Sequence, residues 1–364
     1  FFKQKTAYEI YQCDWSSDVC SSDLGRITFL EWIRGAAAAL VALEHVLEYT
    51  APNLLSHVSD VANPGRAGVV AFFLVSGYVI PLSFERQDVR TFLIRRTFRL
   101  YPVYWLCLTV AVIALASVGE YSDFNPVVVG LAFLVNLTML QGLVLLPSLL
   151  EPAWTLTIEW VFYFQQIIFK RRSSLDSAWV LGYGWAAAFL LVCGVEQITG
   201  IDLPATFALL LAVSCLGHAW ARYDRGRMSG RSVLGMGAVV CGVVPLGMLV
   251  GIDDWSVERY TLSTYAGIAL FAVFWAVRER FESRALVWLG SISYALYLSH
   301  GLLLYPLTHA GDLPGSVVLV ASVIGMPLLA YALHVWLERP FIERGRRLSK
   351  RHLEQPTAPA ASAS

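Results

Sequence analysis

The stretch RGAAAALVALEH, residues 34–45, places an arginine, a glutamate and a histidine in a segment that is otherwise apolar enough to cross a membrane. An α-helix turns about 100° and rises about 1.5 Å per residue, so Arg34 and His45 lie within about 20° of each other and roughly 16 Å apart along the axis. Glu31 and Glu48, each three residues outside this pair, extend the same stripe. Ionisable groups in a bilayer cost several kcal/mol unless they face a cavity or a partner, so the stripe marks a candidate functional site.

Simpler explanations compete with a functional stripe. Arg34 has a side chain long enough to reach the membrane surface, and it is also spaced to form a structural ion pair with Glu31. Glu44 points about 100° away from the stripe and adds nothing to it. His45 favours the functional interpretation, because it shares a face with an arginine and has an acid one turn away that can orient its ring.

The composition of the whole chain predicts a membrane protein. Of its 364 residues 57% are hydrophobic and only 15% are charged, with a mean hydropathy of +0.58. Apolar runs close to the roughly 20 residues that a spanning helix needs recur along it. They lie near residues 30–49, 67–83, 101–118, 126–148, 154–169, 177–194, 204–221, 233–251, 260–277, 286–306 and 316–337. The runs are too long for strands, so we expect an all-α, polytopic membrane helix bundle.

The distribution of positive charge predicts the orientation of the bundle. Five segments hold 21 of the 27 Lys and Arg residues, and the positive-inside rule places all five in the cytoplasm. They are residues 84–100, 170–172, 222–231, 278–284 and 339–352. Because residues 84–100 and 170–172 both lie in the cytoplasm, the chain must cross outward at 101–118 and inward at 154–169. Residues 126–148 therefore start and end on the outer side, and we expect a short helix plus a re-entrant or irregular element there. About ten spans remain, with both termini cytoplasmic.

The two ends of the chain differ from the rest. Residues 1–24 are polar and lack apolar periodicity, so we interpret them as a non-native or disordered extension, and residues 348–364 as a disordered cytoplasmic tail. Residues 25–347 form the predicted membrane domain. We expect the single cysteines in apolar helices to be small buried hydrophobic residues; these are Cys107, Cys193, Cys215 and Cys241. No metal site is predicted.

Six motifs in order resemble those of the acyltransferase-3 family of integral-membrane acyltransferases. They are FLEWIRGAAAALVALEH (29–45), FFLVSGYVI (72–80), RRTFRLYPVYW (95–105), EPAWTLTIEWVFYF (151–164), LGSISYALYLSH (289–300) and ERPF (338–341). The resemblance extends from about residue 27 to 345. It implies transfer of an acyl group, most often acetyl from acetyl-CoA, to a hydroxyl of a carbohydrate or other cell-envelope acceptor. The family's functional residues carry over to Arg34, His45, Glu159, Arg95, Arg96 and Arg99.

Transfer from a thioester to a hydroxyl needs a base, stabilisation of the oxyanion and a grip on the phosphates of CoA. We assign the base to His45, since histidine has an ordinary pKa of about 6.5, and its orientation to Glu48. Guanidinium groups pair well with phosphate, so we expect Arg95, Arg96 and Arg99 to contact CoA. The alternative for these arginines is contact with anionic lipid.

The remaining candidates concern the acceptor. Glu159 is expected near the outer start of its helix, in acceptor binding or in pairing with a buried base; the alternative is a favourable acid in a helix's first turn. Substrate binding is assigned to Trp154, Tyr294, His300 and Ser76. Tyr294 and Tyr297 have an alternative role as aromatic-belt anchors, and Ser76 with Gly77 one in close helix packing.

These expectations define the partners and two competing functions. The partners are acyl-CoA, the acceptor and the lipid bilayer of the cell membrane, without nucleic acid. One alternative is a catalytically inactive family member that acts as a membrane-assembly partner, and the presence of both Arg34 and His45 argues against it. The other is a proton-coupled transporter, in which the buried Arg, His and Glu residues relay protons. A transporter predicts internal repeats, and the sequence shows none.

Overall fold

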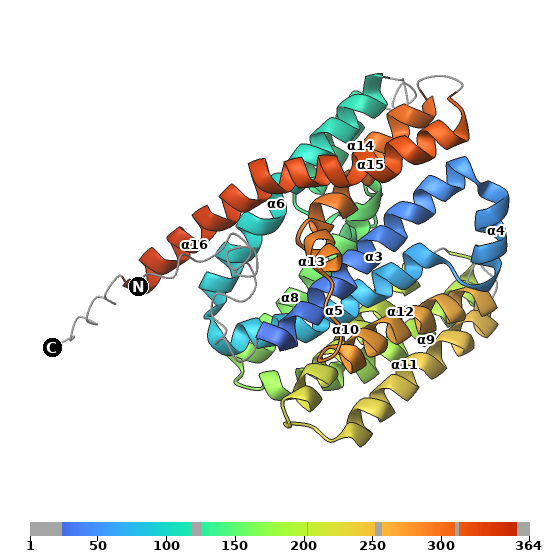
Figure 1. Ribbon diagram of the computed structural model, residues 1–364. Helices are drawn as coiled ribbons and strands as arrows, with labels where there is room; N and C mark the ends of the chain where they lie inside the picture. The colour runs from blue at the N-terminus through green and yellow to red at the C-terminus, as the bar shows by residue number, and fades with distance from the viewer. Residues whose placement is uncertain (1–23, 118–124, 202, 252–256, 310–312, 355–364) are drawn as a thin grey trace.

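The computed structural model describes residues 24–117, 125–201, 203–251, 257–309 and 313–354, and these are helical with no strand among them. Figure 1 shows the arrangement. The helices are α3 (Leu24–Thr50), α4 (Pro52–Val61), α5 (Pro64–Arg86), α6 (Val89–Ser117), α7 (Pro126–Asn136), α8 (Trp154–Arg171), α9 (Leu181–Thr199), α10 (Ala205–Asp224), α11 (Gly230–Gly251), α12 (Val257–Val277), α13 (Arg284–Ser291), α14 (Ser293–His309), α15 (Gly315–Leu333) and α16 (Arg339–Glu354). Short 3₁₀ turns occur at η2 (Gln141–Val144), η3 (Glu151–Ala153) and η4 (Leu175–Val180), and a π-helical turn at η5 (His334–Glu338).

The expected membrane bundle is confirmed. Seven of the helices in the described ranges are long and apolar enough to cross a bilayer, and the bent pair α13–α14 makes eight. With α3 and α8, which have 27 and 18 residues but more charge, each of the ten segments expected to span corresponds to a helix or a bent pair.

One expected span is not a continuous helix. Residues 286–306 are divided between α13 and α14, which are bent by 70° where Ile292 leaves helical geometry (φ −98°, ψ 1°). α13 packs tightly on α3, because a Cβ at Gly35 would lie 2.7 Å from the carbonyl oxygen of Leu286, and one at Gly290 would strike the backbone of Glu31. This contact holds α13 at an angle to the helix that follows it.

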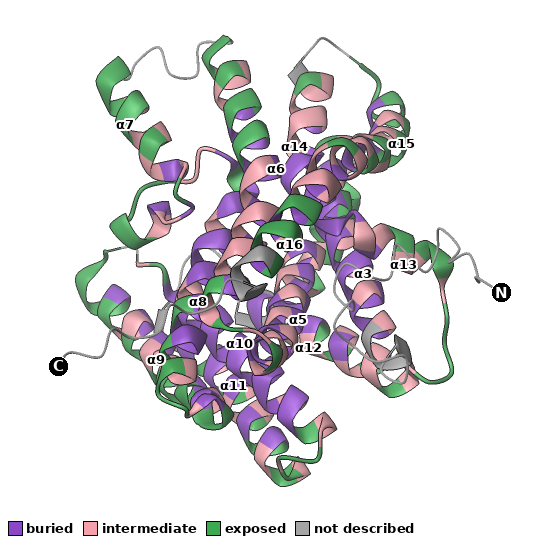
Figure 2. Cartoon of the chain, turned by 90° about the vertical axis from the view of Figure 1, so that its left-hand side faces the viewer, coloured by how far each residue is buried: buried purple, intermediate pink, exposed green. Residues whose placement is uncertain are grey.

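The centre of the bundle is built on α5 and α10. The spans of α10 and α5 are 83% and 67% buried, against 22–39% for the other candidate spans, and Figure 2 shows the buried residues concentrated there. The two helices touch backbone to backbone: a Cβ at Gly77 would strike the carbonyl of Ser214, and one at Gly217 that of Leu74. Glycines therefore set the distance between the two central helices, as small residues do in membrane bundles.

Residues 126–148 contain a short helix followed by irregular backbone, as expected. At about 1.5 Å per residue, the 11 residues of α7 are too short to cross a bilayer. The irregular part is held by Asn136, whose side-chain amide donates to the carbonyls of Ala132 and Pro147 while its Oδ1 accepts from the backbone of Leu149. Such bonds satisfy backbone groups that lipid cannot satisfy.

The chain ends differ from the predicted boundaries. Residues 1–23 and 355–364 lie outside the described part, so most of the predicted extension and tail does too. Residues 348–354, assigned to the disordered tail, instead continue α16. The reason is packing on α6: Gly345 lies against Phe98, and the hydroxyl of Ser349 accepts a hydrogen bond from Arg95 Nε at 3.1 Å.

Candidate active site

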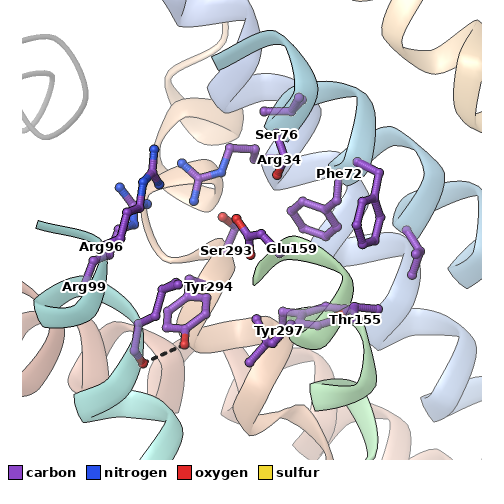
Figure 3. A pocket seen from close by; sticks show the side chains of 15 residues that line it. Arg34, Phe72, Ser76, Arg96, Arg99, Thr155, Glu159, Ser293, Tyr294 and Tyr297 are labelled. Atoms are coloured by element: carbon purple, nitrogen blue, oxygen red, sulfur yellow. Dashed lines mark hydrogen bonds between the residues drawn. The ribbon is translucent and has the colours of Figure 1, made fainter. Parts of the chain in front are cut away.

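Two adjoining cavities are lined by the predicted site residues except Arg95 and His300. The first, which we call the arginine cavity, has about 730 Å³ of empty space and is open at one side. Figure 3 shows Arg34, Arg96 and Arg99 on one side of it, with Glu159 and Ser293 facing them. Its lining comprises Arg34, Val69, Phe72, Phe73, Val75, Ser76, Arg96, Arg99, Leu100, Thr155, Leu156, Glu159, Ser293, Tyr294 and Tyr297.

The arginines come from two helices. Arg34 of α3 donates to Glu31 at 3.1 Å, the pairing that the spacing predicts. Arg96 of α6 lies over aromatic rings, with its guanidinium carbon 5.3 Å from the centroid of Phe92 and 5.6 Å from that of Tyr163. Arg96 and Arg99 are three residues apart on one helix and therefore share a face.

Arg95 does not line the arginine cavity. Successive residues of a helix point about 100° apart, so the side chain of Arg95 leaves the cavity face and donates to Ser349 of α16. The predicted set of three loop arginines thus divides into two cavity residues and one residue that ties α6 to α16. All three arginines lie within α6 and not in a loop.

The helix α6 begins directly after Asp88. Burial alone would raise the pKa of the Asp88 carboxyl, but hydrogen bonds from Thr91 and from the backbone of Arg90 outweigh burial and lower this pKa.

Glu159 of α8 faces a different cavity from Trp154 at the start of the same helix. It lines the arginine cavity rather than the one that contains Trp154, and it accepts a hydrogen bond from the hydroxyl of Tyr163. Five residues of α8 rise about 7.5 Å, which carries Glu159 away from Trp154 at the N-terminal end of the helix. The acid therefore faces the arginines.

The two tyrosines are inside the bundle and not in an aromatic belt. Tyr294 and Tyr297 are each 8% exposed. The Tyr294 hydroxyl donates to the carbonyl of Leu100 at 2.7 Å, and the Tyr297 hydroxyl is 3.1 Å from that of Thr155. Both side chains are walls of the arginine cavity, as Figure 3 shows.

The second cavity, which we call the histidine cavity, has about 900 Å³ of empty space. The Nδ1 of His45 is 3.1 Å from Glu48 Oε2. A carboxylate only accepts, so Nδ1 is the donor and Nε2 of the neutral ring keeps its lone pair. The lining comprises Val41, Glu44, His45, Glu48, Asn63, Gly65, Arg66, Val69, Val70, Glu151, Pro152, Trp154, Thr206, Leu209, Leu210, Tyr260, Thr264 and Tyr297.

A second histidine lies against the first. The rings of His45 and His300 are stacked, with centroids 5.0 Å apart and planes 13° apart. His300 is 1% exposed, and its Nδ1 donates to the carbonyl of Tyr297 at 2.9 Å. Val69 and Tyr297 line both cavities, so the two spaces share these side chains as walls beside the histidine pair.

Several residues that line the histidine cavity were not predicted from the sequence. Glu44 is buried and lines the histidine cavity. Its carboxylate accepts a hydrogen bond from the side-chain amide of Asn63 and contacts Gly65 at the start of α5, and these contacts fix its direction. Arg66 stacks on Tyr260, with its guanidinium carbon 3.8 Å from the ring centroid. The one available signal is Asn63 followed by Pro64, which marks a helix start. Across the residues that the structure describes, no group of three or more His, Cys, Asp or Glu side chains is placed to hold a metal ion.

Comparison with known proteins identifies the family of the chain. The profile of the acyltransferase-3 family, described as an acyltransferase domain, matches residues 27–335. The exopolysaccharide production protein ExoZ of Rhizobium meliloti (strain 1021) is 27% identical over 301 residues, which cover 78% of this chain and 91% of that protein. No solved structure matches the chain. The chain therefore belongs to the acyltransferase-3 family, and it is a multi-pass membrane acyltransferase.

Proposed function

We propose that the protein transfers an acyl group, in the simplest case acetyl, from acyl-CoA to a hydroxyl of a carbohydrate acceptor of the cell envelope. One observation carries the proposal: a cavity walled by arginines shares Val69 and Tyr297 with an adjoining cavity that contains a histidine–glutamate pair. The similarity to a protein named for exopolysaccharide production supports a polysaccharide acceptor.

The arginine cavity suits the donor. CoA carries phosphates, and guanidinium groups pair with phosphate through charged, often bidentate, hydrogen bonds. Arg34, Arg96 and Arg99 converge on this cavity, and its other walls include Phe72 and Leu156, which offer apolar surface to the pantetheine arm. A donor bound here would bring its thioester toward Tyr297 and the adjoining cavity.

The histidine cavity suits the acceptor and the proton transfer. His45 Nε2 takes the hydroxyl proton while the acceptor oxygen attacks the thioester carbonyl carbon, and the resulting imidazolium stays paired with Glu48. Collapse of the tetrahedral intermediate breaks the carbon–sulfur bond, and the imidazolium returns the proton to the CoA thiolate. Trp154 and Tyr260 provide aromatic surfaces on the acceptor side.

Direct transfer without a covalent acyl-enzyme is the simpler route. Cysteine is the strongest candidate nucleophile for a thioester, but none of the cysteines described lines either cavity. Cys107, Cys193 and Cys215 are instead buried between helices.

The proposed orientation follows from the positive-inside rule. With the basic segments in the cytoplasm, the arginine cavity opens toward the cytoplasmic supply of acyl-CoA, and His45 lies in the outer half of the cell membrane. Both termini are then cytoplasmic. The acceptor enters from the opposite side of the bilayer from the donor.

The test is acetyl transfer from radiolabelled acetyl-CoA in membranes that contain the protein. We expect label in a hydroxylamine-labile ester of the envelope fraction, and a loss of at least about 100-fold in His45→Ala at matched abundance. His57→Ala changes an exposed histidine of α4 and is the matched control. Equal label in wild type and His45→Ala would remove His45 from catalysis, and no label in either would favour another donor or a transport function.

A further inference from the structure

A π-helical turn interrupts the long helix formed by α15 and α16. It runs over His334–Glu338, directly before Pro340. Pro340 has no N–H to donate to the carbonyl four residues earlier, so the regular helical ladder cannot continue through this point. Turns of this kind inside α-helices occur frequently at functional sites.

The turn buries two ionisable side chains. His334 Nδ1 donates to Glu338 Oε2 at 2.8 Å, and the two residues are 3% and 1% exposed. Placing such groups inside a membrane protein is costly, and their mutual hydrogen bond offsets only part of that cost. The pair is among the most enclosed polar contacts of the described residues, and neither cavity lining includes it.

The turn packs against the helix that carries two of the cavity arginines. η5 packs against α6, the helix of Arg96 and Arg99. The charges that act on Arg99 include those of Arg34, Glu338, Arg96 and Glu31. Glu338 is thus a buried carboxylate on a turn packed against α6, and it acts on Arg99 without itself lining the cavity.

Three guanidinium groups that share one cavity repel one another, and each has its own support. Arg34 is paired with Glu31, and Arg96 lies over two aromatic rings. For Arg99, the negative charge of Glu338 acts from the turn packed against α6, and His334 holds this carboxylate by donating to it.

We infer that Glu338, held by His334 on the π-helical turn, is a positioning residue that keeps the Arg99 guanidinium at the wall of the arginine cavity, where it receives the phosphates of the donor. The inference rests on the proposed function, because it takes acyl-CoA as the occupant of that cavity. It adds two residues outside the cavity to the donor site, and gives the π-turn a role.

The experiment compares Glu338→Gln with Glu343→Gln. Glutamine keeps the size of Glu338 and can still accept from His334, so the change removes the charge and little else. Glu343 is an exposed neighbour on α16, paired with Arg339 at 3.6 Å, and serves as the control. CoA binding is measured on purified protein in detergent, and the KM values for acetyl-CoA and acceptor are measured in membranes.

We expect Glu338→Gln to weaken CoA binding and raise the KM for acetyl-CoA about tenfold, with the acceptor KM and the control unchanged. His334→Phe should act in the same direction, whereas His334→Gln, which keeps a donor, should resemble wild type. If Glu338→Gln does not fold, the comparison of His334→Phe with His334→Gln tests the same inference.

The outcomes separate this inference from the proposed function. Equal CoA binding by wild type, Glu338→Gln and His334→Phe would overturn the inference alone. A parallel rise in donor and acceptor KM would show a general structural role and would also overturn it. A wild-type protein that neither binds CoA nor transfers an acyl group would overturn the proposed function and the inference with it.

Discussion

The polar side chains that line the arginine cavity differ in whether their hydrogen-bonding groups have partners within the protein. Arg34 pairs with Glu31 and Tyr294 donates to a backbone carbonyl, but the hydroxyl of Ser293 is fully buried at the cavity wall without a hydrogen-bond partner. An unsatisfied buried hydroxyl costs about 1–3 kcal/mol. A ligand that bonds to Ser293 would recover this cost, which makes Ser293 a donor contact under the proposed function.

Ser293→Ala separates this role from a structural one. We expect a KM for acetyl-CoA that is about 3- to 10-fold higher, because one hydrogen bond to the donor is lost. The melting temperature should stay level or rise, since an unpaired hydroxyl is removed. Ser322→Ala is the control, because Ser322 of α15 is also buried and unpartnered but lines neither cavity. An unchanged KM would exclude Ser293 from donor binding.

At the scale of elements, backbone contacts of glycine position the helices that carry the site. Ser76 at the arginine cavity is followed by Gly77, where α5 touches α10. On α3, Gly35 allows α13 to approach beside Arg34. The contacts between helices therefore determine how wide the cavity is, and a small displacement of one helix moves its wall.

Gly77→Ala should destabilise the protein by about 1–3 kcal/mol, because the added Cβ strikes the carbonyl of Ser214 and forces the two helices apart. Gly235→Ala provides the opposite case on α11, where a Cβ meets no atom within 4 Å. There we expect a gain of about 0.5–1 kcal/mol from the better helix former. Melting temperatures in one detergent compare the two, and a stable Gly77→Ala would contradict the tight α5–α10 contact.

At the scale of the whole molecule, the positions of the cavities along the bundle give the reaction a direction. Arg34 and His45 are about 16 Å apart along α3, roughly half of a hydrocarbon core. The cavities near these residues share Tyr297 as a wall, and under the proposed function donor and acceptor approach it from opposite ends. The proposed orientation gives the arginine end to the cytoplasm.

Cysteine labelling tests this orientation. In a background without native cysteines, Ser229→Cys lies in the exposed turn before α11, and Thr199→Cys lies at the opposite end of the bundle, at the end of α9. A membrane-impermeant maleimide should label Thr199→Cys in intact cells and Ser229→Cys only after permeabilisation. The reverse pattern would place the arginine cavity on the side without acyl-CoA and would contradict the proposed donor route.

Much of the fold and part of the site could be predicted from local sequence. Helix length and apolarity predict the bundle, and periodicity within one helix predicts the Arg34–Glu31 and His45–Glu48 pairs, since both depend on spacing alone. The division of Arg95 from Arg96 escaped prediction. A hydropathy pattern does not show which face of α6 meets α16, and this contact decides where Arg95 points.

The sequence by itself therefore determined the membrane class, the family and the stripe of charge along α3, because these depend on composition, order and helical spacing. Only the tertiary structure decided which residues share a cavity. It brought His300 to His45, placed Glu159 in the arginine cavity and Glu44 in the histidine cavity, and packed the turn that carries Glu338 against α6. The physical reason is that these groups lie on different helices, whose relative rotation and depth are set by backbone contacts at glycines and by buried hydrogen bonds between helices distant in sequence.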